Sequence, residues 1–251
     1  MLDLIICELI KLKRKKFFLL TIFAATLFPI PSVLIMKHSN FDFNNMYSLM
    51  MLTGEFLLLP CVLGIMASIL FFSERDSNTL KNFLIIPVSK AKFVLAKLSV
   101  LLLMSIFYSF VATLATIIGG AMVADVSMVF EKNILSVCVG FFVAIAVMPM
   151  VAIILLFARN QMIACILGCA YTIINYVFVW NLGEMSTYKL ALLPLAATYR
   201  FFLPSLAVVR TQYVLEVSMK SVEYIPAILS VGVIALVVTI CAFKHKFIRR
   251  E

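Results

Sequence analysis

Long apolar runs separated by short polar gaps dominate the pattern of residues along this chain. Six of these runs reach the roughly 20 residues that a helix needs to cross a bilayer. We therefore expect an all-α polytopic membrane protein in which residues 1–251 form a single transmembrane domain. The six spans are predicted at about residues 17–36, 47–72, 98–124, 133–157, 162–182 and 224–243.

The segment before the first span, residues 1–16, has polar and apolar positions at helical spacing. The apolar stripe consists of Leu2, Ile5, Ile6, Leu9 and Leu12, and the polar face or its edges hold Glu8, Lys11, Arg14 and Lys15. This pattern is typical of an amphipathic helix that lies in the membrane interface, and its lysines suit anionic lipid headgroups. A merely solvated basic N-terminus is the alternative, but it would not need the apolar stripe.

One long polar interruption, residues 73–97, separates the second and third spans. Its first half predicts a short helix, because Asp76 or Ser77 can cap a helix N-terminus. The apolar residues of that helix share one face and are Leu80, Phe83 and Leu84. The interruption therefore predicts a small amphipathic helix at the membrane surface.

Pro87 marks a break within this interruption. The residue before a proline is pushed towards an extended conformation, so the short helix should end near Ile86. Ser89 can then cap a second helix that continues through Lys97 into the third span. We therefore expect a short helix, a break at Pro87 and a stem that leads into the membrane.

Composition and charge place these segments relative to the membrane. Hydrophobic residues make up 64% of the chain and charged residues only 13%, which excludes an ordinary soluble domain. A net charge of +9 could indicate nucleic-acid binding, but the basic residues lie in the gaps between spans, so we expect no nucleic-acid partner. Fifteen of the 21 Lys and Arg residues fall on one side of the six-span topology. The positive-inside rule therefore predicts a cell-membrane protein with both termini and residues 73–97 in the cytoplasm.

Residues 189–209 are apolar enough to suggest a seventh span, but they carry Arg200 in the middle and prolines at Pro194 and Pro204. A seventh span would also move the basic C-terminal tail to the other side of the membrane. We therefore expect a re-entrant or surface helical hairpin in the outer leaflet, with Arg200 near its tip or snorkelling. An ordinary extracellular loop is the alternative.

Small residues and prolines predict how the spans pack. Small residues recur at four-residue spacing in Ser105, Ser109 and Thr113, in Ala112, Thr116 and Gly120, and in Ala164, Gly168 and Thr172. Such stripes let helices approach closely and indicate a packed bundle or a subunit interface. The prolines expected to kink the first, second and fourth spans are Pro29, Pro31, Pro60 and Pro149.

Residues that could carry chemistry are few. His38 and His245 lie at opposite membrane faces, no carboxylate pair falls at helical spacing within a span, and the sequence has no GxxxxGK[ST] nucleotide loop. The six cysteines have no CxxC motif and no close histidine, so we interpret them as small apolar fillers. We therefore expect no enzyme activity, catalytic residue, metal or cofactor in this chain.

Three polar residues are candidates for a substrate path: Glu55, Asn175 and Arg200. Glu55 is the one acid within a predicted span, near the outer end of the second helix and one turn from Pro60. An intramembrane acid suggests a role in handling a cationic substrate or a proton, and an interfacial position or a structural role is the alternative. Asn175 could equally form a hydrogen bond with a neighbouring helix.

The amphipathic N-terminal segment, the six spans and the cytoplasmic loop together resemble the permease subunits of ABC-2 type transporters. The loop carries the resemblance in Glu74, Thr79–Leu80, Pro87–Val88–Ser89–Lys90 and Lys97. It is most similar to the branch associated with bacitracin and lantibiotic self-protection. Asn78 and Lys90 stand where many family members have glycine and arginine, but asparagine tolerates a left-handed backbone and lysine keeps the charge.

The resemblance implies a division of labour with other subunits. It implies that the loop forms a coupling helix that docks on a separate cytoplasmic ATP-binding cassette subunit. It also implies a second permease subunit, identical or homologous, a re-entrant element between spans five and six, and ATP-driven expulsion of a peptide antibiotic or other amphipathic substrate. The expected docking residues are Glu74, Asp76, Thr79, Leu80, Lys81, Phe83, Leu84, Pro87 and Lys90.

A membrane sensor or scaffold is another class of protein that fits the pattern, since the same loop could dock a cytoplasmic signalling partner. A stand-alone secondary carrier would show inverted repeats and broken polar helices at the middle of the membrane, and neither is apparent in the sequence. Recovery with an ATP-binding subunit or with a kinase would distinguish the transporter from the sensor.

Overall fold

The fold comes from a computed structural model that describes residues 2–13, 42–76, 89–122, 128–180, 193–206 and 221–248, together with scattered positions between Thr21 and Leu34. The elements in this part of the chain are all helical. They are α1 (Leu2–Lys13), α4 (Phe43–Met50), the π-helix η1 (Met51–Leu58), α5 (Leu59–Asp76), α7 (Lys90–Ala121), α8 (Val129–Ala146), α9 (Met148–Phe157), α10 (Gln161–Trp180), α12 (Pro194–Leu206) and α14 (Ser221–Ile248).

Five stretches of helix among the described residues are long and apolar enough to cross a membrane. They are Phe43–Phe72, Lys90–Ala121, Val129–Phe157, Gln161–Val179 and Tyr224–Phe243. These stretches coincide with the second to sixth predicted spans, which confirms a multi-pass helical membrane protein. The first predicted span, residues 17–36, falls on a segment with only scattered described positions, so a sixth span stays a prediction.

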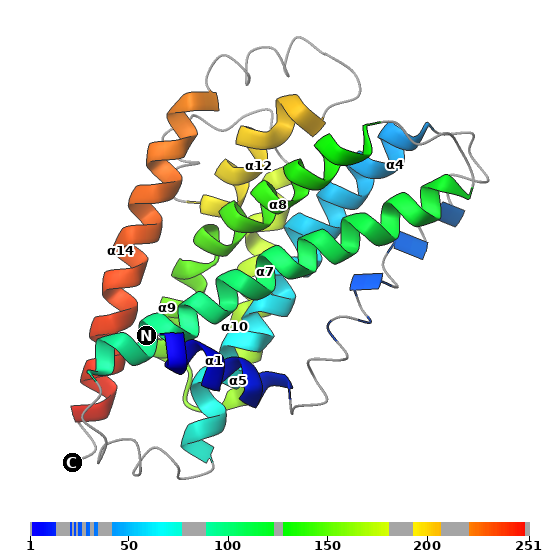
Figure 1. Cartoon of the computed structure of the whole chain (residues 1–251). Helices are drawn as coiled ribbons and strands as arrows, with labels where there is room; N and C mark the ends of the chain where they lie inside the picture. The colour runs from blue at the N-terminus through cyan, green and yellow to red at the C-terminus, as the bar shows by residue number, and fades with distance from the viewer. Residues whose placement is uncertain are drawn as a thin grey trace.

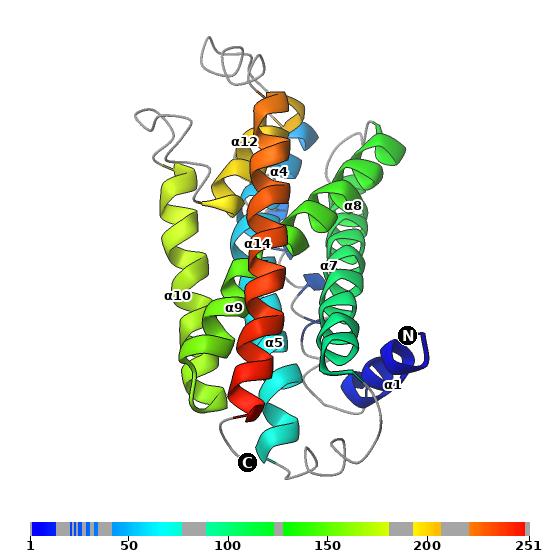
Figure 2. The same ribbon diagram turned by 90° about the vertical axis from the view of Figure 1, so that its left-hand side faces the viewer.

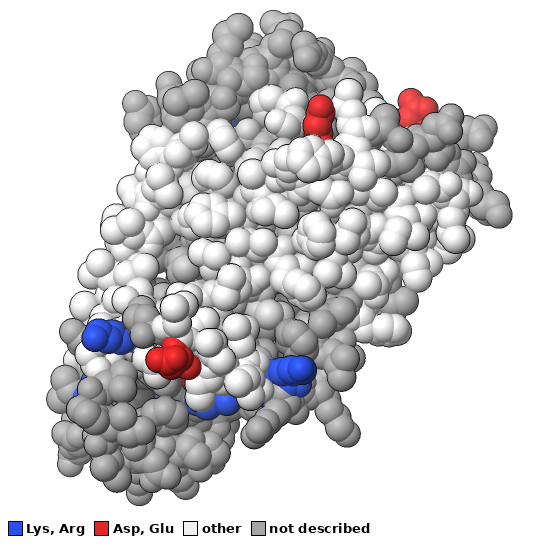
Figure 3. Space-filling model, viewed as in Figure 1, with Lys and Arg blue, Asp and Glu red and all other residues white. Residues whose placement is uncertain are grey.

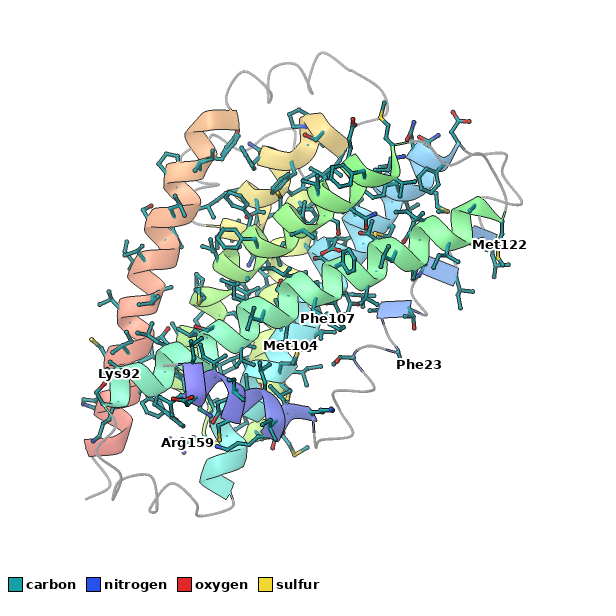
Figure 4. All side chains as sticks on the ribbon, viewed as in Figure 1. Phe23, Lys92, Met104, Phe107, Met122 and Arg159 are labelled. Carbon is teal, nitrogen blue, oxygen red and sulfur yellow. The ribbon has the colours of Figure 1, made fainter. Side chains whose placement is uncertain are left out.

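The helices run side by side in one bundle, and α1 lies across one end of it next to the first turns of α7 (Figures 1 and 2). We call this end the base. It also holds the end of α5, the end of α14 and the α9–α10 turn with Arg159 (Figure 4), whereas α4 and α12 lie at the opposite end. On the face shown in Figure 3, the middle of the bundle is uncharged and the described charged residues lie towards the two ends.

Small residues bring neighbouring helices close together, as the four-residue stripes predict. Ser105 and Ser109 of α7 are fully buried, and Ser105 Oγ donates a hydrogen bond of 2.7 Å to the carbonyl of Gly140 in α8. A Cβ atom at Gly140 would lie only 2.4 Å from Ser109 Oγ. In the same way, a Cβ at Gly64 of α5 would lie 3.2 Å from the Cα of Gly168 in α10.

The prolines of the second and fourth spans coincide with local changes in the helix. The fourth span is interrupted between α8 and α9 at Val147, two residues before Pro149. A proline inside a helix removes one backbone hydrogen bond and crowds the preceding turn. Pro60 follows η1, where the N–H of Leu59 bonds to the carbonyl of Gly54 in the wider π pattern.

The short helix α12 has 13 residues, which is too few to cross a bilayer. It packs against α8, α10 and α14, and residues 181–192 and 207–220 on either side lie outside the described part of the chain. The re-entrant hairpin therefore stays a prediction. The predicted tip or snorkelling position of Arg200 is wrong, because this residue lies in mid-helix and is only 4% exposed within the chain.

Candidate functional site

The N-terminus of α7 positions the first group of candidate residues. Ser89 has extended backbone, and its Oγ accepts a hydrogen bond of 3.4 Å from the N–H of Lys92. The bond satisfies one of the N–H groups that a helix start leaves without a partner, which confirms the predicted cap. The helix that begins here runs without a break through Lys97 to Ala121.

Lys97 lies at the centre of a buried cluster at the base, with only 1% of its surface exposed. Its Nζ is 3.3 Å from Oε2 of Glu8 in α1, and it also donates a hydrogen bond to the carbonyl of Leu70 in α5. The same atom lies 4.6 Å from the ring centre of Phe93 and 5.6 Å from that of Phe71. These five residues, which we call the base cluster, give a buried charge the ion pair and hydrogen bond that it needs.

The position of Glu8 on α1 differs from the one expected from the sequence. The prediction that Glu8 lies on the polar face or its edge is wrong, because Glu8 is 4% exposed and points into the bundle. It pairs with Lys97, and its Oε1 also pairs with Nζ of Lys11 at 2.9 Å. Leu12 of the predicted apolar stripe is buried on the same side, and Ile5 and Leu9 pack against the core, whereas Leu2 is 73% exposed. The inward face of α1 therefore combines part of the apolar stripe with the ion pair of Glu8.

The predicted docking residues surround this cluster in the sequence, and the structure describes only some of them. Glu74 belongs to the last turns of α5, and Asp76 is its final residue. The helix of the second span is thus described as far as Asp76, and its candidate membrane-spanning stretch ends at Phe72, as predicted. Lys90 is the first residue of α7. Outside the described residues lie Thr79, Leu80, Lys81, Phe83, Leu84 and Pro87.

A second polar site lies inside the bundle around Glu55, which is in η1 and fully buried. Its Oε2 accepts a hydrogen bond of 2.5 Å from Ser109 Oγ in α7, and its Oε1 lies 3.5 Å from Ser136 Oγ in α8. Ser136 Oγ also donates to the carbonyl of Ser109 at 2.9 Å and accepts from Oγ1 of Thr113 at 2.5 Å. We call Glu55, Ser109, Thr113 and Ser136 the hydroxyl cluster.

The helix that carries Glu55 starts earlier in the chain than predicted. The helix that carries it begins at Phe43 instead of residue 47, and the candidate span continues to Phe72. Glu55 therefore lies well inside this span and is covered by α7 and α8. An intramembrane acid at such a position is a functional candidate.

The other two residues of the predicted substrate path do not join this cluster. Asn175 is 1% exposed, and its Nδ2 donates a hydrogen bond of 3.0 Å to the carbonyl of Tyr171 within α10. Arg200 lies on α12, and the described hydrogen bonds and ion pairs of Glu55 involve neither residue. The structure thus supports Glu55 as a centre but does not assemble the three predicted residues around it.

Sequence reasoning missed several residues of these sites. It noted Ser109 and Thr113 only as small residues, and it did not name Ser136. The four-residue spacing of hydroxyl side chains on α7 was the signal, because those hydroxyls need partners on a neighbouring helix. From the sequence, Lys132 was counted only as one of the charges between spans. In the structure this residue is 8% exposed, and its Nζ lies 2.7 Å from Oδ1 of Asn44.

The fold and these sites define a multi-pass membrane protein with a buried acid in the bundle and a charged cluster at one end. The family model described as ABC-2 family transporter protein matches residues 4–175, which is more than half of the chain. The chain therefore belongs to the ABC-2 transporter family, and this membership supports a permease that works with an ATP-binding cassette subunit. A comparison with curated protein sequences found no match.

Proposed function

We propose that this chain is the membrane-spanning permease subunit of an ATP-driven exporter, and that residues 73–97 dock a cytoplasmic ATP-binding cassette subunit. The base cluster is the observation that carries this proposal. It joins α1, α5 and α7 beside the point where α5 ends and α7 begins. A firm connection at this point is what a permease needs in order to convert movement of a partner into movement of its spans.

The chemistry of the loop supports a docking role. Its apolar residues would occupy a groove on the ATP-binding subunit, and its charged residues would set the register by pairing at the rim. The apolar residues are Leu80, Phe83 and Leu84, and the charged ones are Glu74, Asp76, Lys81 and Lys90. Pro87 would separate this docking helix from the stem that begins at Ser89. Movement of the docking helix would then reach α7 directly, and α1 and α5 through Lys97.

The remaining parts of the proposal follow from the charge pattern and the resemblance. The base faces the cytoplasm, because most basic residues belong to the segments at this end. A second permease subunit, identical or homologous, completes the membrane pathway. The transported molecule is a peptide antibiotic or another amphipathic substrate, expelled outwards as in the bacitracin and lantibiotic self-protection branch.

A double substitution in the loop, Leu80→Asp with Phe83→Asp, tests the docking role. Two charges on the apolar face would oppose burial in a groove, so the ATP-binding subunit should no longer copurify and transport-linked ATP hydrolysis should be lost. The matched control is Met128→Asp with Phe130→Asp, which adds the same charges at positions that are 66% and 77% exposed at the opposite end. Unchanged coupled ATP hydrolysis in the loop variant would refute the docking assignment.

Copurification also distinguishes the transporter from a membrane sensor or scaffold. We expect the chain to be recovered with an ATP-binding subunit whose hydrolysis rate changes when bacitracin or a lantibiotic is added. Recovery with a kinase, and without any nucleotide-binding subunit, would instead support the sensor. The loop variant is informative in both cases, because either partner would have to dock on the same residues.

A further inference from the structure

Docking at the base gives no role to the buried acid of η1. Glu55 is 0% exposed, and its described hydrogen-bonding partners are the hydroxyls of Ser109 in α7 and Ser136 in α8. The carboxyl group therefore lies where three elements meet. Figure 1 shows α7 and α8 side by side along this part of the bundle. The charge on this group consequently affects the packing of all three elements.

Close packing of α7 and α8 holds these hydroxyls in place. Ser105 Oγ donates to the carbonyl of Gly140 at 2.7 Å, and this bond joins the two helices one turn from Ser109. A Cβ atom at Gly140 would lie 2.4 Å from Ser109 Oγ, so the helices meet here because residue 140 has no side chain. The positions of the hydroxyls beside Glu55 are therefore set by the contact between the helices.

The number of hydroxyl hydrogens in the hydroxyl cluster limits how many bonds Glu55 can accept. A serine or threonine hydroxyl has one hydrogen to donate and two lone pairs that accept. Ser136 Oγ lies 2.9 Å from the carbonyl oxygen of Ser109, which can only accept, so this contact uses the hydrogen of Ser136. Thr113 Oγ1 lies 2.5 Å from Ser136 Oγ and must then be the donor in that pair. Ser136 therefore has no hydrogen left for Glu55.

The two oxygens of Glu55 consequently have different surroundings. Oε2 accepts the hydrogen of Ser109 Oγ at 2.5 Å. Oε1 lies 3.5 Å from Ser136 Oγ and has no described donor. Two oxygens without a hydrogen between them repel, whereas a proton on Oε1 turns the contact into a long hydrogen bond and gives Ser136 one donated and two accepted bonds. The hydroxyl cluster therefore suits a carboxylic acid better than a carboxylate.

No described positive charge pairs with Glu55. The elements packed against η1 are α4, α5, α8, α10 and α12, and Ser109 brings α7 to the same site. The titratable groups on them that interact with Glu55 are the phenols of Tyr47 and Tyr108, which are neutral near pH 7. The charged residues of α5 and α7 lie at the base. The charged residues of the other elements are Glu131, Lys132 and Arg200, and no described ion pair joins them to Glu55.

Lys132 is the one cation of α8 and lies one helical turn before Ser136. Its Nζ lies 2.7 Å from Oδ1 of Asn44 and 4.0 Å from the ring centre of Phe43. An amide oxygen and an aromatic face are neutral partners, so this lysine does not balance a carboxylate at Glu55. Removal of an unpaired carboxylate from water is costly, and a bound proton removes this cost.

We propose that Glu55 is a proton-binding site that holds η1, α7 and α8 together. In the packed bundle the carboxylic acid donates from Oε1 to Ser136 Oγ and accepts from Ser109 Oγ at Oε2. When the acid dissociates, its O–H bond breaks, the electron pair stays on Oε1, and the proton passes to a base in solution such as hydroxide. The carboxylate then repels Ser136 Oγ, so the contact between η1 and α8 weakens. This proposal goes beyond docking at the base and does not depend on it.

Infrared difference spectra between the wild type and Glu55→Gln test the proton directly. The full chain would be measured with its copurified ATP-binding subunit in mixed micelles near pH 7. We expect the carbonyl band of a protonated carboxyl group, lost in Glu55→Gln and kept in Glu131→Gln, which replaces an exposed acid of α8. Carboxylate bands in place of this band would overturn the proposal.

The hydroxyl that accepts the proton is tested in the same spectra, with Glu55 itself unchanged. Ser136→Ala removes the acceptor beside Oε1, so the carbonyl band should move to a higher frequency, where carboxyl groups without this bond absorb. Ser105→Ala is the matched control, because it removes a hydroxyl from the same contact of α7 with α8 and should leave the band in place. No shift in Ser136→Ala, or an equal shift in both variants, would overturn the assigned bond.

The pH dependence of unfolding provides an independent measurement. A chain that holds a proton on Glu55 when folded, and loses it when unfolded, becomes less stable as the pH rises, because the unfolded state binds fewer protons. From about pH 5 to about pH 7, the unfolding equilibrium constant of the wild type should rise about tenfold more per pH unit than that of Glu55→Gln. Glu131→Gln should keep the wild-type slope. Equal slopes in the wild type and Glu55→Gln would show that Glu55 holds no such proton.

Discussion

Glu8 and Lys97 allow a quantitative test of the base cluster, because the number of described ion pairs differs between the two residues. Lys97 is 1% exposed, and Glu8 is its one described carboxylate partner. Glu8 has a second partner in Lys11, whose side chain is 38% exposed. Removal of the charge of Glu8 therefore takes the described ion pair from a buried lysine, whereas removal of Lys97 leaves Glu8 with Lys11.

The two single substitutions should therefore lower the free energy of unfolding by different amounts. Loss of one partner from a buried ion pair costs about 3–5 kcal/mol, and Glu8→Gln should fall in this range. The aromatic faces of Phe93 and Phe71 offset part of this cost, since a cation–π contact contributes about 0.5–2 kcal/mol. Lys97→Met should cost less, on the order of 1–2 kcal/mol, because the carboxylate keeps a charged partner near the surface.

A double-mutant cycle with Glu8→Gln, Lys97→Met and both together measures this difference. The free energy of unfolding would be determined by reversible denaturation in mixed micelles. We expect the double variant to be more stable than Glu8→Gln alone, since it contains no buried lysine that has lost this ion pair. Equal costs for the two single variants, or strictly additive costs in the cycle, would refute the account of the cluster.

Two further substitutions test the packing and the cap. Gly140→Ala places a methyl group 2.4 Å from the present position of Ser109 Oγ, so it should destabilise the bundle by roughly 1–3 kcal/mol, measured in the same denaturation assay. Gly232→Ala at the α14 contact has one close neighbour, Cγ2 of Ile145 at 2.6 Å, whereas Gly140 also has a backbone oxygen at 3.1 Å. Gly232→Ala should therefore cost less, and a larger cost there would contradict the reasoning. Ser89→Ala should remove about 1 kcal/mol from the start of α7 and speed hydrogen exchange of the first turn, with no change near Ala121. Unaltered exchange at Lys92 would show that the cap is not formed.

The sequence was sufficient to predict the parts of the fold that depend on local pattern. Membrane spans need long apolar runs, and this requirement placed the helices of spans two to six within a few residues. The cap at Ser89 and the close packing at Gly168 were also predicted, because both depend on residue type at a fixed spacing.

The parts that depend on distant partners could not be predicted. Glu8 was assigned to the polar face because it is charged, but it lies inwards with Leu12, where it pairs with a lysine 89 residues later. Glu55 looked peripheral because the start of its helix, Phe43, lies in a polar stretch that hydropathy assigns to a loop. Arg200 was expected near the surface because it is a lone charge in an apolar segment, but α12 packs against η1, α8, α10 and α14, and Arg200 is buried.

The pairing of Glu8 with Lys97 also sets an order of events during synthesis. The ribosome makes α1 first, but Lys97 is 89 residues further along the chain. At about 5–20 residues per second, α1 has to wait roughly 4–18 s for its charged partner. During this interval the apolar side chains of α1 can rest on the membrane surface, and its final position is reached only after α7 has entered the bilayer. Helix α1 is therefore made well before α7 but reaches its place only after it.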